Sequence, residues 1–162
     1  MKKRVLLARP SSLIVSDMKR LMGDANVEPV PLTSLDDLTS TDSEEVAGIV
    51  ISTALTSSVK ESYCRVLEIA MRVHPGIPVF IASFTNIKRT LIIVKSHLKE
   101  ANLDMDVLTL SEAQAKGDID YFKEVTIITR EEISDPQLYP GTLSVVSDML
   151  SSRLQHSQRV AN

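Results

Sequence analysis

Residues 77–83 read Ile77-Pro78-Val79-Phe80-Ile81-Ala82-Ser83, an apolar run that ends in a hydroxyl side chain. A short run that is apolar throughout, rather than alternately apolar and polar, is typical of a strand buried on both faces of a parallel sheet. The proline stands near the entry of the run, where a strand tolerates the loss of one backbone donor. The stretch therefore predicts a central β-strand that helices cover on both sides.

Further apolar runs lie on either side of this stretch, and segments of helical period separate them. Strands are expected at residues 5–8, 27–32, 46–51, 105–110 and 124–129. Helices are expected between Ser11 or Ser12 and Gly23, from Ser57 or Ser58 to the residues before His74, and over residues 86–101 and 142–155. Pro29 and Pro31 remove two backbone donors from the second run, so this strand is expected at an edge of the sheet.

The alternation of strand and helix decides the fold class, because right-handed crossovers between parallel strands place helices on both faces of a sheet. The prediction is a doubly wound α/β three-layer sandwich with a mainly parallel sheet of five or six strands. The chain has 162 residues, and neither an internal repeat nor a low-complexity linker divides it. Residues 1–162 are therefore expected to form a single domain.

Composition and charge narrow the classes of partner. The chain is 43% hydrophobic but only 4% aromatic, which suits a core of aliphatic side chains. Eighteen basic and 21 acidic residues give a net charge of −3, so nucleic acid is not favoured as the main partner. No apolar stretch has the length of a signal peptide or a membrane span, so a cytoplasmic protein without membrane contact is expected.

Sites for catalysis, metals and cofactors find little support. The glycines stand at positions 23, 48, 76, 117 and 141, so neither a G-x-G-x-x-G run nor a P-loop can be formed. The single Cys64 has no disulfide partner and is expected to be a small buried hydrophobe. These observations predict a protein without a cofactor that binds rather than catalyses.

The histidines and paired aspartates do not change this prediction. The three histidines lack metal-ligand spacing and are expected at the surface, at positions His74, His97 and His156. Two pairs of aspartates lie at strand or turn boundaries without a partner base, namely Asp104 with Asp106 and Asp118 with Asp120. Turn chemistry explains these pairs better than acid–base catalysis.

Three of the apolar runs, with the residues that follow them, are similar to the receiver domain of response regulators. The segments are Val5–Pro10, Gly48–Ser52 and Ile77–Ser83, the last being the closest match. The resemblance implies a flavodoxin-like fold with a core at about residues 3–115. It leaves residues 116–156 as a C-terminal extension with an extra strand and helix, followed by a frayed tail at 157–162.

The sequence departs from the receiver pattern at the phosphorylation site. The resemblance implies acidic metal ligands at Arg9 and Pro10, and a phospho-accepting aspartate at Ser52, beside Thr53. It also implies a lysine near residues 109–111, where Thr109, Leu110 and Ser111 stand. Only Ser83 matches the switch position. Because Mg²⁺ requires oxygen anions and an arginine repels it, we expect a degenerate pseudo-receiver that regulates without phosphorylation.

An alternative function uses the same positions. Ligands of open α/β sheets bind at the carboxyl ends of the strands, and a helix N-terminus favours anions. A small anion or nucleotide is therefore the alternative ligand of a site formed by Arg9, Ser11, Ser52, Thr53 and Ser83. The competing structural interpretation is that Arg9 fills the vacated metal pocket and that the hydroxyl groups satisfy the hydrogen-bonding groups at the strand ends.

The helix expected at residues 86–101 has an unusual outer face. Four residues fall within a narrow arc and are expected to face the sheet, namely Ile87, Leu91, Val94 and Leu98. Two isoleucines and four cations are expected to point outward, namely Ile92, Ile93, Lys88, Arg89, Lys95 and Lys99. This face is the candidate surface for another signalling protein. The alternatives are a second packing layer formed by the C-terminal segment and a nucleic-acid patch.

The last helix also has a broad apolar stripe. Its members are Leu143, Val146, Leu150 and Leu154, widened by Val145 and Met149. The stripe is compatible with a homodimer that forms through this helix, since burying one further aliphatic side chain contributes about 1.5–3 kcal/mol. The alternative is that the helix covers the sheet and the sixth strand.

Overall fold

The structure of the chain is a computed structural model that describes residues 3–54, 57 and 59–161, with side chains up to Ser151. The described residues form one six-stranded sheet whose strand pairs are all parallel. The strands are β1 (Arg4–Arg9), β2 (Glu28–Pro31), β3 (Val46–Ser52), β4 (Val79–Ser83), β5 (Asp106–Leu108) and β6 (Glu124–Thr129). Their order across the sheet is β2-β1-β3-β4-β6-β5.

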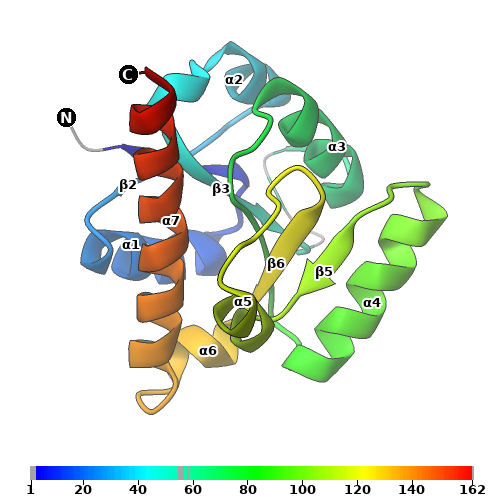
Figure 1. Cartoon of the computed structure of the whole chain (residues 1–162). Helices are drawn as coiled ribbons and strands as arrows, with labels where there is room; N and C mark the ends of the chain where they lie inside the picture. Colours follow the sequence, from blue (N-terminus) through cyan, green and yellow to red (C-terminus); the bar gives the residue numbers. More distant parts are fainter. Residues whose placement is uncertain (1–2, 55–56, 58, 162) are drawn as a thin grey trace.

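Helices cover both faces of this sheet (Figure 1). They are α1 (Ser12–Asp24), α2 (Leu35–Ser40), α3 (Tyr63–Val73), α4 (Ile87–Glu100), α5 (Leu110–Lys116), α6 (Arg130–Ser134) and α7 (Tyr139–Ala161), with a 3-10 turn at Ser43–Glu45. Side chains of α2, α3 and α4 pack in one core, and those of α1, α5, α6 and α7 pack in the other. The three-layer α/β sandwich expected from the sequence is confirmed.

Strand β4 lies in the middle of the sheet, as its apolar run predicts. All five of its residues are buried, and it pairs with β3 on one side and with β6 on the other. Ile81 belongs to the core beneath α3 and α4, while Phe80 and Ala82 belong to the core beneath α1 and α7. A strand that buries both of its faces has no place for polar side chains before its last residue, Ser83.

Strand β2 lies at an edge, which also agrees with the sequence. It pairs with β1 in the register Val5 to Pro29 and Leu7 to Pro31. Each proline lacks a backbone N–H, so the strand cannot pair fully on two sides. The prolines therefore place this strand at the edge of the sheet.

The last strands do not follow their order along the chain. Strand β6 lies next to β4, and β5 lies outside it at the second edge. The flavodoxin-like order 2-1-3-4-5 has a single strand after β4, and in this chain β6 occupies that position. The crossover through α4 passes over one strand position, and the crossover through α5 returns on the opposite face of the sheet. The pair β5–α5 is thus the addition to the flavodoxin-like order.

This strand order bears on the expected core boundary near residue 115. Residues after that boundary form β6, which pairs with β4, and α7, which packs on β3 (Figure 1). A Cβ atom on Gly48 of β3 would lie only 2.7 Å from Leu150 Cδ2 of α7, so the helix and the strand approach closely. The single-domain organisation of residues 1–162 stays a prediction.

The apolar stripe of α7 faces the sheet over its described half. Four of its residues are buried, namely Val145, Val146, Met149 and Leu150, and Leu143 is partly buried. The side chain of Leu154 lies outside the described residues. The packing of these five residues accounts for the breadth of the stripe, and a homodimer through α7 stays a prediction. None of the helices formed by the described residues is long and apolar enough to cross a membrane.

Candidate functional site at the strand ends and on helix α4

The carboxyl ends of four neighbouring strands meet at one edge of the sheet. Arg9 ends β1, Ser52 ends β3, Ser83 ends β4 and Thr129 ends β6. Because the strands are parallel and adjacent, these ends lie side by side, and Ser83 is the register partner of Thr129. We call Arg9, Ser52, Ser83 and the Thr129–Arg130 pair the strand-end corner.

Arg9 is buried in this corner and holds backbone carbonyl groups. Its Nε donates to the Glu61 carbonyl at 3.1 Å, and its Nη1 donates to the Ser52 carbonyl at 3.0 Å and also to the Ala54 carbonyl. Only 7% of the residue is exposed, and this burial lowers the pKa of the guanidinium group. The cation thus connects the end of β3 with Glu61, two residues before the start of α3.

The hydroxyl groups of the corner have local partners. Ser52 Oγ accepts the Ala54 N–H at 3.0 Å, and Ser83 Oγ accepts the Thr85 N–H at 3.2 Å. Thr90 of α4 donates its hydroxyl to Ser83 Oγ at 3.1 Å. These hydrogen bonds shape the two loops that leave β3 and β4, as the structural interpretation of the corner predicted.

The other candidates at this edge contribute less. Pro10 is buried, and the Thr53 N–H donates to the Ala82 carbonyl at 3.0 Å. Ser11 stands at the N-cap of α1, but its side chain makes no capping bond, and its Oγ is buried without a partner among the described residues. The structure places all these positions at one edge, where Arg9 and Arg130 supply positive charge.

The receiver lysine was expected near Thr109, Leu110 or Ser111, and this position is wrong. The strand beside β4 is β6, so the corresponding position is Thr129–Arg130. Thr109 instead caps α5, accepting the Glu112 N–H at 3.1 Å. The misplacement arises because two expected strands, at residues 105–110 and 124–129, follow α4, and chain order alone does not tell which one adjoins β4.

Arg130 brings a carboxylate to this edge. Its Nε lies 3.5 Å from Asp17 Oδ2 of α1. Burial raises the pKa of Asp17, and the charges of Arg130 and Arg20 partly oppose this shift. The signal for Arg130 was its place directly after the apolar run 124–129. Nothing in the sequence marked Asp17 as its partner, because the contact joins residues that are far apart in the chain.

The strand ends of the corner differ from an acidic metal site in their side chains. Arginine ends the first strand, where a metal site needs a carboxylate, and a buried serine ends the third. Across the residues that the structure describes, no three His, Cys, Asp or Glu side chains are grouped so that they could hold a metal ion. Arg9 holds carbonyl oxygens, Arg130 lies beside the Asp17 carboxylate, and Thr129 donates to the buried Glu132 carboxylate. These carboxylates do not form an acidic set for Mg²⁺ among the described residues.

Helix α4 presents the second candidate site. Asn86 caps it by accepting the Arg89 N–H at 2.8 Å, and the helix ends before Asn102, whose φ of 57° is left-handed. The expected inner face is confirmed, since Val94 and Leu98 are buried and Ile87 and Leu91 are partly buried.

The expected outer face of α4 is only partly correct. Ile92 is 62% exposed, and all four cations are exposed, at positions Lys88, Arg89, Lys95 and Lys99. Ile93, expected to be exposed, is half-buried. It lies on the same flank of the helix as His97, whose Nδ1 shares a hydrogen bond with the Tyr63 hydroxyl of α3. The flank of α4 that faces α3 therefore includes Ile93.

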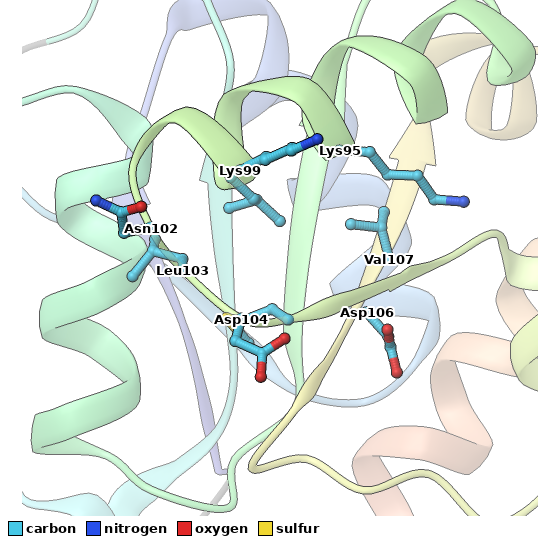
Figure 2. A pocket seen from close by; sticks show the side chains of 9 residues that line it. Lys95, Lys99, Asn102, Leu103, Asp104, Asp106 and Val107 are labelled. Carbon is cyan, nitrogen blue, oxygen red and sulfur yellow. The ribbon is translucent and has the colours of Figure 1, made fainter.

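A groove lies along the opposite flank of α4, between this helix and the edge strand β5 (Figure 2). Its volume is about 460 Å³, and its lining is Lys95, Leu98, Lys99, Asn102, Leu103, Asp104, Met105, Asp106 and Val107. Figure 2 shows the carboxylates of Asp104 and Asp106 pointing away from the two lysines. The groove thus has a cationic wall on α4.

The remaining sequence candidates are structural. His74, expected at the surface, is fully buried, with Nε2 2.8 Å from the Leu38 carbonyl and Nδ1 2.7 Å from Ser43 Oγ. Cys64 is partly buried against the core, and burial raises the pKa of its thiol. Asp120 accepts the Phe122 N–H at 3.0 Å, which is turn chemistry as predicted.

The last sequence candidates are three aspartates and His156. Asp104, Asp106 and Asp118 are exposed. The side chain of His156 lies outside the described residues.

Comparisons with known proteins identify the fold. No protein-family model matches the sequence, and no curated protein sequence matches it. A response regulator receiver protein from Sinorhizobium medicae WSM419 matches with a TM-score of 0.53 and 14% identity, covering 94% of this chain and 97% of that one. A response regulator receiver domain protein from Clostridium thermocellum matches with a TM-score of 0.51 and 12% identity, covering 98% of each chain.

A third structure is longer than this chain. NtrX from Brucella abortus, solved in complex with ADP, matches with a TM-score of 0.59 and 12% identity. The match covers 100% of this chain but 30% of NtrX. Identities of this size show the fold alone. The parallel sheet, its helices on both faces and these neighbours together show that the chain has the flavodoxin-like fold of response-regulator receiver domains.

Proposed function

We propose that this chain is a pseudo-receiver that regulates by binding another signalling protein, without phosphorylation and without catalysis. The observation that carries the proposal is Arg9, a buried cation at the end of β1 that donates to the carbonyls of Ser52, Ala54 and Glu61. The fold shared with receiver domains supports a signalling role, and the altered corner supports a role that does not depend on a phosphoryl group.

The physical reason concerns charge at the end of β1. Transfer of a phosphoryl group to a receiver needs Mg²⁺, which prefers carboxylate oxygens and which offsets the charge of the phosphoryl oxygens. Arg9 places a fixed positive charge beside Ser52 instead. Serine is also a weak nucleophile without an adjacent base, and the Ser52 hydroxyl accepts a hydrogen bond from the Ala54 N–H.

The exposed side of α4 supports a binding role. Four cations and Ile92 are exposed on this helix, whereas the whole chain has a net charge of −3. A basic surface on a molecule of negative net charge favours an acidic partner and speeds its association. We therefore place the partner surface at Lys88, Arg89, Ile92, Ile93, Lys95 and Lys99.

Phosphorylation by a small-molecule donor tests the proposal. The full chain is incubated with acetyl phosphate and Mg²⁺, beside a receiver domain that has the acidic residues, and intact mass is measured at acidic pH. We expect the control to gain a phosphoryl group and this chain to gain none. A stoichiometric, base-labile adduct on this chain would contradict the proposal.

The anion-binding alternative makes a different prediction. A small anion or nucleotide bound by Arg9, Ser11, Ser52, Thr53 and Ser83 would raise the melting temperature, because a ligand of the folded state stabilises it by mass action. We expect no such stabilisation from a panel of phosphate, sulfate and nucleotides. Stabilisation that Arg9→Ala removes would support the alternative and would count against a role that depends on protein partners alone.

A further inference from the structure

One side of α4 has the residue spacing of a helix–helix contact, although it faces solvent. Lys88, Ile92, Lys95 and Lys99 are spaced by four, three and four residues. At about 100° per residue these four positions fall within an arc of about 60° and form a line about 17 Å long. We call these four residues the lysine seam. A spacing of alternately four and three residues is that of side chains that meet a second helix lying alongside.

The seam has no partner within the part of the chain that the structure describes. Its lysines make no hydrogen bond or ion pair with a described residue, and Ile92 is 62% exposed. By contrast, Arg4, Arg65 and Arg130 each lie within 4 Å of a carboxylate. Cations that are not used by the fold keep their full attraction for an external carboxylate.

The groove beside the seam has the same polarity. Lys95 and Lys99 form one wall, and the buried side chains of Leu98 and Val107 lie at its base. Asp104 and Asp106 line the groove on the β5 side, and their carboxylates point away from the two lysines (Figure 2). Asp106 alternates with Val107 along the strand, so it faces the opposite side of the sheet. There the pKa of Lys116 is raised by its hydrogen bond with Glu124 and also by the charge of Asp106.

These observations define the chemistry of an occupant. We propose that the lysine seam binds an amphipathic helix of another protein, with carboxylates that meet the lysines and an apolar residue that covers Ile92. The proposal rests on the proposed binding function and names its partner class. The long lysine stems lie on apolar surface while their amines reach the carboxylates. The edge strand β5 is an unsuitable partner for an added strand, because it is three residues long and begins with Asp106, two residues after Asp104.

A synthetic helix serves as the probe. It is fluorescein-labelled, has about 18 residues, and carries leucines at heptad spacing with glutamates beside them. A matched peptide has glutamine in place of each glutamate. Fluorescence anisotropy with the full chain measures the dissociation constant. We expect the glutamate peptide to bind at least about tenfold more tightly than the glutamine peptide, and the difference to shrink as NaCl is raised to about 300 mM.

Charge reversal locates the site. Lys95→Glu/Lys99→Glu is expected to weaken binding of the glutamate peptide by at least about tenfold. The matched control is Lys19→Glu/Lys123→Glu, which changes the net charge equally at two exposed lysines outside the seam. The control is expected to weaken binding by less than about threefold, because only the long-range charge changes. Lys95→Arg/Lys99→Arg keeps the charge and is expected to retain binding. Equal urea midpoints for the glutamate variant and the original chain exclude loss of folding as the cause.

Three outcomes would overturn the proposal. The first is equal weakening by the seam variant and the control variant. The second is tighter binding of a DNA duplex than of the glutamate peptide through the same lysines. The third is a dimer of the chain alone that Lys95→Glu/Lys99→Glu disrupts, which would make a second copy the occupant. None of these results produces a phosphoryl adduct, so they leave the phosphorylation-independent function standing.

Discussion

The strand-end corner and the lysine seam both carry positive charge, but the fold uses the two charges differently. In the corner, Arg9 is buried and donates to three carbonyl groups, and Arg130 lies 3.5 Å from Asp17. On α4, the seam lysines are exposed and pair with no described residue. The fold thus uses the cations of the corner in its own contacts, whereas the seam lysines have no described partner.

Under the proposed function, this difference would separate binding at α4 from phosphorylation at the strand ends. A receiver domain couples chemistry at the strand ends to binding at its surface. In this chain the hydroxyl of Thr90, on α4, still donates to Ser83 Oγ at 3.1 Å, so the corner and α4 remain in contact. The proposed loss of phosphorylation would leave this contact as a permanent structural link, and α4 would keep one position.

The largest expected effect distinguishes Arg9 from an exposed arginine. Arg9→Met leaves the carbonyls of Ser52, Ala54 and Glu61 without their donor. Because a buried polar group without a partner costs about 1–3 kcal/mol, we expect the free energy of unfolding to fall by about 2–4 kcal/mol in urea titrations. The matched variant Arg89→Met removes an exposed cation and is expected to change it by less than about 0.5 kcal/mol. Equal effects would mean that the corner does not hold the fold together.

A smaller effect separates the two isoleucines of α4. Ile92→Asp replaces an exposed side chain and is expected to change the free energy of unfolding by less than about 0.5 kcal/mol. Ile93→Asp places a charge at a half-buried position on the flank toward α3, and is expected to lower it by about 1–2 kcal/mol. Urea titrations of both variants measure the difference. If both variants lost stability equally, Ile92 would be buried in solution and the seam would have a partner within the chain.

The sequence predicted the layers of the fold and the inner face of α4, for identifiable reasons. The apolar run at β4 requires burial on both faces, so its strand must lie inside the sheet. The prolines of β2 lack a backbone donor, so their strand must lie at an edge. The same holds for Val94 and Leu98, which helical spacing assigns to one side.

The features that sequence reasoning missed are contacts between distant segments. The order of β5 and β6 in the sheet depends on which of the two crossovers passes over a strand position. Both crossovers have ordinary lengths, so the sequence does not show which one does. The carbonyl partners of Arg9 belong to Ser52 at the end of β3 and to two residues of the loop that follows. Every residue has a backbone carbonyl group, so the sequence does not mark these three. His74 is buried because Leu38 and Ser43, more than 30 positions earlier, supply both of its hydrogen bonds.

The smallest expected effect concerns Asp17 in the corner. Burial raises the pKa of this carboxyl group despite Arg130 and Arg20. When the pKa of a carboxyl group is higher in the folded chain than in the unfolded chain, the folded chain loses stability as pH rises through these two pKa values. The Asp17→Asn variant has no such loss of stability, because asparagine does not titrate. The free energy of unfolding of Asp17→Asn minus that of the original chain is therefore expected to increase from about pH 3 to about pH 7.

Urea titrations across this range measure the difference, and Asp104→Asn corrects for the loss of one exposed carboxylate. A difference that falls with rising pH would mean that the Asp17–Arg130 ion pair outweighs the cost of burying the carboxylate. The corner would then stabilise a carboxylate beside an arginine. That result would weaken the distinction between the corner and the seam, because Arg130 would then be suited to bind an anion, as the seam lysines are. The anion-binding alternative would gain support.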